Sequence, residues 1–172
     1  MPEELKKFPS IPKLDFTLWR AARKKEEEEA RVRAIENAAA GDVMPDGTIY
    51  AGISPDTHKR MFVTPEDARL SMNFNDAAEY AKTLNAHGHN DWRIPTKDEL
   101  NIFFDNREKG ALAGTFNQTN DPGDLMNGWR YWYRSSTPGY SDNNAWIQDF
   151  SDGHQNGNGS RRFIIASVRC VR

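Results

Sequence analysis

The last forty-four residues of the chain, 129–172, read WRYWYRSSTPGYSDNNAWIQDFSDGHQNGNGSRRFIIASVRCVR. Short apolar runs recur in this stretch, and Ser, Asn, Asp, Gly, His, Gln and Arg separate them, which predicts three or four short strands. The apolar runs are Tyr131-Trp132, Ala145-Trp146-Ile147, Phe163-Ile164-Ile165 and the positions Val168, Cys170 and Val171. Binding paratopes favour the same mixture of Tyr, Trp, Arg, Ser, Asn and Gly, because it gives adaptable contacts at low entropic cost. The stretch therefore predicts a rigid frame that carries a polar surface.

Strand-like and helix-like segments precede this stretch. Residues 48–53 and 60–64 are rich in β-forming residues and flank the turn-forming run 54–58, which predicts a hairpin. Asn73 is an expected N-cap for a helix ending at Gly88, with an inner face of Phe74, Ala77, Ala78, Ala81 and Leu84. Thr96 and Glu99 have the spacing of a capping box, which predicts a second helix with Leu100, Phe103 and Phe104 facing inward. After a long loop at 109–128, the final stretch completes an α+β domain in which two helices pack on small antiparallel sheets.

The N-terminal part of the chain has a different character. Prolines among lysines and glutamates in residues 1–13 predict an extended arm, and residues 15–40 predict a long helix with charges paired four residues apart. Apolar residues gather at the two ends of this helix, at Phe16, Leu18 and Trp19 and then at Val32, Ile35 and Ala39. The helix is either a solvated spacer or a segment that packs against copies of itself to form a homo-oligomer. We therefore divide the chain into an arm and charged helix at 1–42 and a folded domain at 43–172, with a ligand-binding segment at 129–172.

Composition excludes several functional classes. A net charge of −2 and a pI near 6.1 provide no overall basic field for a phosphate backbone, so nucleic acid is not the expected partner. No stretch approaches the roughly 18 apolar residues of a membrane span, and the first ten residues lack the apolar core of a signal peptide. We expect no membrane insertion, and a location in the cytoplasm or in a phage particle or assembly.

Candidate chemical motifs each have a simpler structural explanation. His87, His89 and Asp91 offer metal-ligating groups, but their position after a helix end is typical of turn and cap residues. Asp142, Asp149 and Asp152 are acidic, yet no twelve-residue calcium loop is present. The pair Ser135-Ser136 lacks the frame of a nucleophile elbow, and the glycines at 153, 157 and 159 lack the lysine and helix of a phosphate loop. The single cysteine, Cys170, is expected to be buried in a strand, with Val168 and Cys170 on one face and Arg169 and Val171 on the other. We therefore expect no cofactor, no bound metal and no catalytic group.

A resemblance to a known family rests on a series of short motifs in a fixed order. They are Asp91-Trp92-Arg93-Ile94-Pro95-Thr96-Lys97-Asp98-Glu99-Leu100, Tyr131-Trp132, Ser135-Ser136-Thr137, Asn144-Ala145-Trp146, Phe150-Ser151-Asp152-Gly153 and Val168-Arg169-Cys170-Val171-Arg172. From about Met44 to Arg172 the chain resembles the DUF1566 family, which is related to the C-type lectin fold of the formylglycine-generating type. The resemblance implies a lectin-like scaffold held by Trp92, Leu100, Phe103, Trp132, Trp146, Phe150, Ile164 and Val168. The oxidases among these relatives need a pair of active-site cysteines, and this chain has one cysteine.

The chain also resembles the variable proteins of diversity-generating retroelements, many of which have this fold and end in such a segment. In those proteins, adenine-directed mutagenesis changes surface codons and leaves the strand frame unaltered. The resemblance implies a ligand-binding surface, with Tyr133, Tyr140, Arg161 and Arg162 as its anchors. The full set is Tyr133, Arg134, Tyr140, Asp142, Asn143, Asn144, Gln148, Asp149, His154, Asn156, Asn158, Ser160, Arg161 and Arg162.

The function expected from the sequence is non-enzymatic binding of a protein or glycan by a variable surface on a lectin-like domain. Two alternatives stay open: an invariant structural or adhesin subunit of a phage or bacterial surface assembly, and an enzyme related to formylglycine-generating oxidases. The polar positions are expected to face the partner together.

Overall fold

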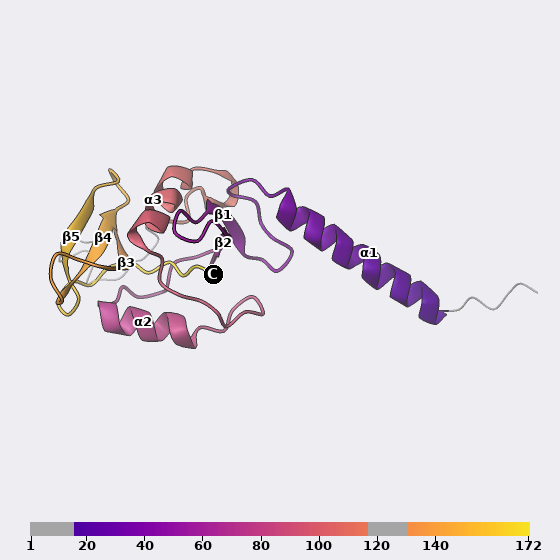
Figure 1. Cartoon of the computed structure of the whole chain (residues 1–172), viewed down its shortest axis with the longest axis horizontal. Coiled ribbons are helices and arrows are strands. Elements are labelled where there is room, and N and C mark those ends of the chain that lie inside the picture. The colour runs from indigo at the N-terminus through magenta and orange to yellow at the C-terminus, as the bar shows by residue number, and fades with distance from the viewer. Residues whose placement is uncertain (1–15, 117–130) are drawn as a thin grey trace, which may run out of the picture. The chain divides into compact units, whose positions relative to one another are not determined.

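The computed structural model describes residues 16–116 and 131–172 (Figure 1). Its contacts divide the chain into two units, residues 1–36 and residues 37–172. Within the described residues of the second unit, two α-helices, a short 3₁₀ helix and two small antiparallel sheets are present, which confirms the predicted α+β class. No helix in the described ranges is long and apolar enough to cross a membrane.

The first unit contains helix α1, Phe16–Glu36. None of its residues is buried, and the pairs Arg23–Glu27 and Lys25–Glu29 lie four residues apart along its surface. The predicted end at Ala40 is wrong, because the helix ends at Glu36. Downstream, the Asp42 carboxylate accepts a hydrogen bond from the Ala39 N–H at 2.8 Å, and Gly41 donates to the Tyr50 carbonyl. Because of these contacts residues 39–42 form a turn, and the helix does not continue to Ala40.

The first sheet of the second unit is a hairpin of β1 (Ile49–Ile53) and β2 (Arg60–Val63), as predicted. Its strands pair in antiparallel register from Ile49 with Val63 to Ile53 with Arg60, with a bulge between Tyr50 and Gly52. The last residues of the chain extend this hairpin, since Phe62 and Arg172 exchange backbone hydrogen bonds. Val171 bridges both Val63 and Arg93, so the C-terminus joins the hairpin to the segment before the second helix of the unit.

Helices α2 (Phe74–Thr83) and α3 (Lys97–Asn106) begin where the sequence predicts. The Asn73 side chain accepts from the Asp76 N–H, and Thr96 and Glu99 form both bonds of a capping box. The predicted end of α2 near Gly88 is wrong: the helix stops at Thr83, because Ala86 and His89 close a tight turn by two backbone hydrogen bonds. Ala78, predicted on the inner face, is exposed, while Ala77 and Ala81 are buried.

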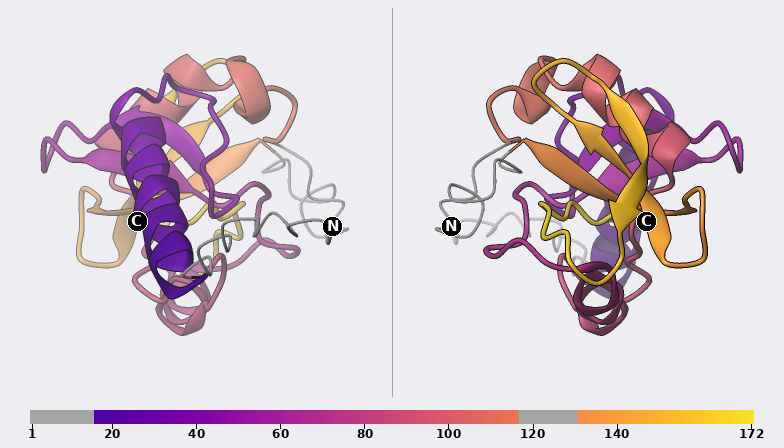
Figure 2. Two further views of the ribbon diagram at one scale, coloured as in Figure 1. Left: turned by 90° about the vertical axis from the view of Figure 1, so that its right-hand side faces the viewer. Right: turned by 90° about the vertical axis from the view of Figure 1, so that its left-hand side faces the viewer.

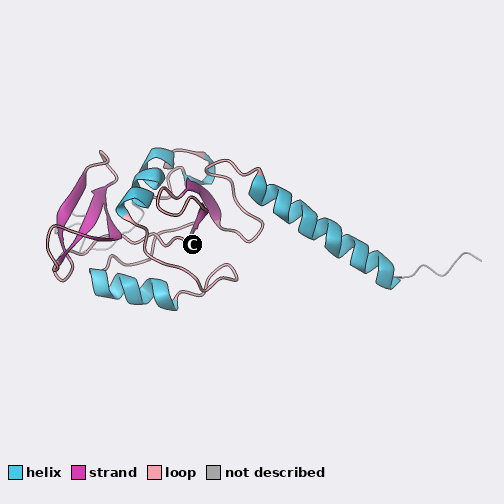
Figure 3. Ribbon diagram, in the orientation of Figure 1, coloured by secondary structure: helices cyan, strands magenta, loops and turns pink. Residues whose placement is uncertain are grey.

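The second sheet contains β3 (Trp132–Pro138), β4 (Asn144–Asp149) and β5 (Gln155–Ser160), with β4 in the centre (Figures 2 and 3). Both strand pairs are antiparallel, with bulges between Arg134 and Pro138 and between Ala145 and Ile147. A short 3₁₀ helix, η1 (Gly110–Leu112), follows α3.

The described residues of the second unit form two hydrophobic clusters in its interior. The larger joins the hairpin, α3, η1 and the second sheet, and it contains Ile49, Ala51, Met61, Val63, Leu100, Phe103, Leu112, Phe116, Tyr133, Phe150 and Val171. The smaller lies around α2 and contains Ala68, Ala77, Ala81, Trp92, Ile94, Val168 and Cys170. The C-terminal segment contributes to both clusters, because Val168 and Cys170 belong to one and Val171 to the other. This alternation confirms the two faces predicted for residues 168–171.

Candidate functional site

The candidate ligand-binding segment is attached to the domain by a buried polar cluster. The Asp67 carboxylate accepts from the Tyr133 hydroxyl and, at 2.6 Å, from Nε of Arg169. The Asp67 and Arg169 side chains are almost completely buried, and the Tyr133 ring packs on Phe150 with 4.3 Å between ring centroids. Arg169 also donates to the carbonyl of Thr64 and lies 4.4 Å above the ring of Phe116. Strand β3, the C-terminal segment and the loop before α2 are therefore held in one fixed arrangement.

Three residues predicted on the ligand-binding surface lie in the interior. Tyr133, Arg134 and Gln148 are each 0% exposed, so the prediction that they belong to the surface is wrong. The Tyr133 hydroxyl is directed at Asp67, and Gln148 donates at 3.2 Å to both the Asn101 side chain and the Gly153 carbonyl. Polar residues in an alternating strand look alike in sequence whether their partners are water or buried groups.

Arg134 is the least expected of these buried residues. Its guanidinium donates to the carbonyls of Ile164 and Ser160, and its Nε has no hydrogen-bond partner within the described part of the chain. Burial lowers the pKa of Arg134 to about 10. The side chain ties β3 to the segment after β5.

The candidate residues that are exposed or partly exposed form two groups at opposite ends of the three-stranded sheet. The group that we call the turn surface consists of the β3–β4 turn and the end of β5 with the residues after it. Its members are Tyr140, Asp142, Asn143, Asn144, Asn158, Ser160, Arg161 and Arg162. At the other end, by the β4–β5 turn, lie Asp149 and His154, with Asn156 between the two groups. The polar positions therefore do not all face a partner together.

Backbone and ring contacts give the turn surface a defined shape. The Tyr140 N–H donates to the Gly157 carbonyl at 3.0 Å, and the Tyr140 ring packs edge-on against Trp146 at 5.2 Å. Arg161 donates from its backbone N–H to the Asn143 carbonyl at 2.8 Å and from Nε to the Asn144 carbonyl at 2.9 Å. Tyr140 is nevertheless 70% exposed, so the ring is held in place and remains accessible.

The polar groups of the second group bond mainly within the β4–β5 turn. The Asp149 carboxylate accepts from the N–H of Ser151 at 2.8 Å and from its hydroxyl at 2.6 Å. The His154 ring meets Trp132 edge-on at 6.0 Å between centroids, and the backbone N–H of His154 donates to the Asp152 carboxylate. Asp149, predicted on the ligand-binding surface, and Asp152 thus act as turn residues.

Phe163 adjoins the turn surface, a position that the sequence does not predict. It was expected in a strand of the frame, but residues 161–165 form no strand, and Phe163 is 78% exposed with Arg162 5.4 Å from its ring. Ile165 of the same run is also exposed, and nothing in the sequence of the run Phe163-Ile164-Ile165 marks these residues as exposed. Of the predicted scaffold, Trp92, Leu100, Phe103, Phe150 and Val168 are buried, whereas Trp132, Trp146 and Ile164 are partly exposed.

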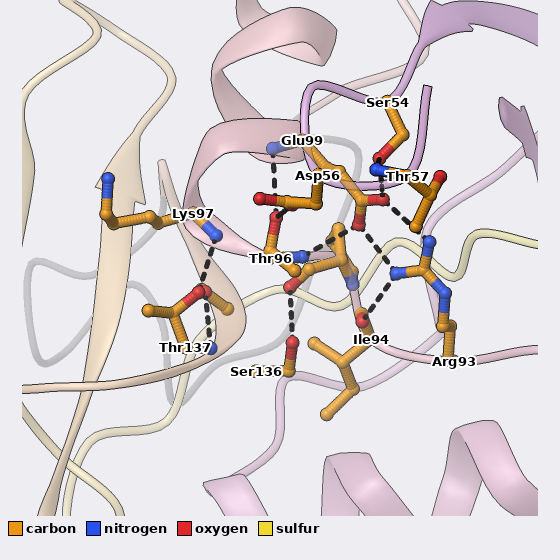
Figure 4. A network of polar contacts seen from close by, with 12 residues as sticks. Ser54, Asp56, Thr57, Arg93, Ile94, Thr96, Lys97, Glu99, Ser136 and Thr137 are labelled. Carbon is orange, nitrogen blue, oxygen red and sulfur yellow. Dashed lines mark hydrogen bonds and ion pairs between the residues drawn. The ribbon is translucent and has the colours of Figure 1, made fainter. Parts of the chain in front are cut away.

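The motif around Pro95 and Glu99 has a structural role (Figure 4). The buried Glu99 carboxylate accepts from Arg93 at 2.6 and 2.7 Å, from the Ser54 hydroxyl at 2.7 Å and from the Thr96 N–H at 2.9 Å. Burial alone would raise the pKa of Glu99, but the hydrogen bonds from Arg93, Ser54 and Thr96 lower it below its ordinary value. This network connects the hairpin to the start of α3.

The same segment also meets β3 of the second sheet. The Ser136 hydroxyl donates to the Pro95 carbonyl at 3.2 Å, and the Lys97 N–H donates to the Thr137 hydroxyl at 3.0 Å. Ser135 accepts from the Thr137 N–H, so both strand serines make hydrogen bonds within the sheet region, in accord with their structural interpretation.

The histidines after α2 contact Asp46, which lies in another loop. His89 Nε2 lies 2.9 Å from Asp46 Oδ2, and His87 Nδ1 lies 3.1 Å from the Asp46 carbonyl. Asp91 pairs with Arg172 at 2.9 Å. Within residues 16–116 and 131–172, no three His, Cys, Asp or Glu side chains are grouped so that they could hold a metal ion.

These features define a small α+β domain with a buried frame and an exposed polar and aromatic end. Residues 54–172 match the Lcl C-terminal domain family, and the chain belongs to this family. No curated protein matches the chain. The match covers α2, α3 and the whole second sheet, and it begins after β1.

Proposed function

We propose that this protein is a non-enzymatic ligand-binding protein whose recognition site is the turn surface together with Phe163. One observation carries the proposal: the exposed aromatic and arginine side chains of Tyr140, Arg162 and Phe163 lie on turns that are fixed to a buried frame. Aromatic residues and arginine dominate binding hot spots, and turns on a rigid sheet lose little entropy on binding. A protein or glycan is the expected ligand.

The state of the only cysteine in the sequence supports binding over thiol chemistry. Cys170 is 1% exposed, and burial raises its pKa to about 12. A reactive thiol needs an accessible thiolate, which this environment disfavours. An enzyme of the formylglycine-generating type is therefore the weaker alternative for this chain.

The proposal includes a lectin-like scaffold and diversification of the surface by a retroelement. Under this proposal, codon changes concentrate at exposed positions such as Tyr140, Asn158 and Arg162, and buried positions such as Arg134 stay constant because their contacts are internal. The neighbouring DNA tests this part: it should hold a reverse-transcriptase gene and a near-copy of codons 129–172 that differs at adenines. A locus without either would contradict diversification and leave ligand binding to be tested separately.

The binding role is tested with a surface variant and a matched control. The surface variant combines Tyr140→Ala, Arg162→Ala and Phe163→Ala in one chain. The control, called the α2 variant, combines Asn75→Ala, Glu79→Ala and Lys82→Ala, which lie on the exposed face of α2. Both chains and the wild type are probed on a printed oligosaccharide array and against a displayed random-peptide library. We expect the wild type and the α2 variant to bind the same probes and the surface variant to lose them. Absence of wild-type binding to both probe sets, or equal binding by all three chains, would contradict the proposal.

A further inference from the structure

Helix α1 carries a regular stripe along one side. Six of its residues follow one another at alternating spacings of three and four: Leu18, Ala21, Lys25, Glu28, Val32 and Ile35. This spacing is the a and d pattern of a heptad, which places all six side chains on one face of the helix. We call this face the α1 stripe. It is apolar at both ends, where Leu18 and Val32 are exposed, and charged in the middle.

The order of residues in the stripe distinguishes two ways in which a second copy could pair with it. In a parallel pair in register, each layer meets its own counterpart, so Lys25 faces Lys25 and Glu28 faces Glu28. In an antiparallel pair, a positions meet d positions. One register then joins Leu18 to Ile35, Ala21 to Val32 and Lys25 to Glu28, and the two-fold axis repeats each of these layers.

The two neighbouring antiparallel registers of the same stripe do not match its chemistry. A shift of one heptad in one direction brings Leu18 opposite Glu28, and a shift in the other direction brings Lys25 opposite Ile35. Both shifts bury a charge against an aliphatic side chain, which is unfavourable. Charge complementarity and apolar matching therefore select the same register.

From this complementarity we propose that α1 pairs with α1 of a second copy of this chain, antiparallel, through the α1 stripe. Lys25 already lies 3.8 Å from Glu29 of its own helix, but that pair is exposed and therefore weak, so Lys25 is able to turn toward Glu28 of the second copy. The charged layers fix orientation and register, and the outer apolar layers bury surface.

The pairing has a geometric consequence for the dimer. The C-terminal ends of the two α1 helices lie at opposite ends of the pair. At a rise of 1.5 Å per residue, their Glu36 residues are about 28 Å apart. Each copy continues from Glu36 into its own C-terminal unit. The dimer is thus bivalent, which raises its avidity for a repeated ligand.

Charge exchange in the full-length chain tests the pairing, with sedimentation equilibrium over a range of concentrations as the measurement. We expect a monomer–dimer equilibrium for the wild type, and at least about tenfold weaker dimerisation for Lys25→Glu and for Glu28→Lys, because each places like charges together. The double exchange, Lys25→Glu with Glu28→Lys, should restore the dimer. Glu27→Lys makes the same charge change as Glu28→Lys away from the stripe and should leave the dimer intact.

A monomeric wild type at every concentration, unaffected single variants, or a double exchange that fails to recover the dimer would overturn the proposal.

Introduced cysteines test the orientation separately. A mixture of Leu18→Cys and Ile35→Cys chains should form a mixed disulfide, whereas Leu18→Cys chains alone should not, because their Cα atoms would be about 26 Å apart and a disulfide spans at most about 7 Å. The buried Cys170 gives little background. Efficient self-linking of Leu18→Cys chains would show parallel pairing and contradict the proposal.

Discussion

Buried polar residues fix the positions of segments that are far apart in the sequence. Glu99 connects the hairpin and the start of α3, and Asp67 connects β3 and the C-terminal segment. A buried carboxylate of this kind costs solvation free energy, which its hydrogen bonds offset. When one hydrogen-bonding partner is removed, the other group stays buried without the hydrogen bonds that offset its lost solvation. Single substitutions at these residues therefore lower the stability of the fold strongly.

The first prediction concerns Glu99→Gln. The amide keeps the shape but removes the charge that Arg93 and Ser54 contact, so we expect the free energy of unfolding to fall by about 2 kcal/mol. This lies below the 3–5 kcal/mol typical of fully buried pairs, because the Arg93 side chain is 42% exposed and water screens it. Glu108→Gln is the control, since Glu108 is 77% exposed beside Arg107. Urea unfolding of both variants makes the comparison, and equal stability would contradict the role given to Glu99.

The second prediction concerns acid stability and Asp46. Burial alone would raise the pKa of this carboxyl above its ordinary value of 3.8. The hydrogen bonds from Thr48 and the contact with His89 outweigh burial and lower the pKa to about 2. The folded state therefore binds the proton less readily than the unfolded state. Asp46 stabilises the fold fully above about pH 4, and this contribution is lost as the pH falls from about 4 to about 2.

The measurement is thermal unfolding of the wild type and Asp46→Asn as a function of pH. The contribution is of the order of 1–2 kcal/mol, so the wild type should exceed the variant at pH 6 and converge with it near pH 2. A stability difference that does not change with pH would show that Asp46 acts by shape alone.

At the scale of the elements, the β3–β4 turn depends on a glycine. A Cβ atom on Gly139 would lie 2.1 Å from the Gly157 carbonyl oxygen and 2.8 Å from Cβ of Asn144. Neither neighbour is the end of a flexible side chain, so the turn and β5 must separate. The position of Tyr140 depends on this close approach, because its N–H bonds to the same Gly157 carbonyl.

The third prediction is that Gly139→Ala displaces the turn surface and destabilises the protein by about 1–3 kcal/mol. Gly88→Ala is the comparison: among the described residues no atom lies within 4 Å of its Cβ, and its φ of +78° opposes the change, at about 1 kcal/mol. Amide NMR shifts of residues 139–144 and 157 should change in Gly139→Ala and stay constant in Gly88→Ala. Unchanged shifts in Gly139→Ala would contradict the close approach of the turn to β5.

Elements defined by local chemistry could be predicted from the sequence, and those defined by distant partners could not. The capping box of Thr96 and Glu99 and the N-cap Asn73 are readable because donor and acceptor are three residues apart. Tyr133 is buried because of Asp67, sixty-six residues away, and Phe163 is exposed because the segment after β5 forms no strand. For the candidate site, the exposure of the β3–β4 turn could therefore be predicted, and the burial of Tyr133, Arg134 and Gln148 could not.

At the scale of the whole molecule, the two hydrophobic clusters that the described residues form contain residues of the second unit alone. The fourth prediction is that a chain beginning at Asn37 unfolds at the melting temperature of the full chain, within a few degrees. It should also lose the concentration-dependent dimer that α1 supplies. Calorimetry and sedimentation equilibrium measure the two properties, and a large fall in melting temperature would contradict the independence of the second unit.

The central claim, recognition by the turn surface, is tested most directly by titration calorimetry with the probe that the wild type selects from the array or the library. Three single variants, Tyr140→Ala, Arg162→Ala and Phe163→Ala, are compared with Lys82→Ala on α2. The account predicts at least about tenfold weaker binding for two or more of the three variants, with unchanged melting temperatures, and wild-type affinity for Lys82→Ala. Wild-type affinity in all three surface variants would contradict it.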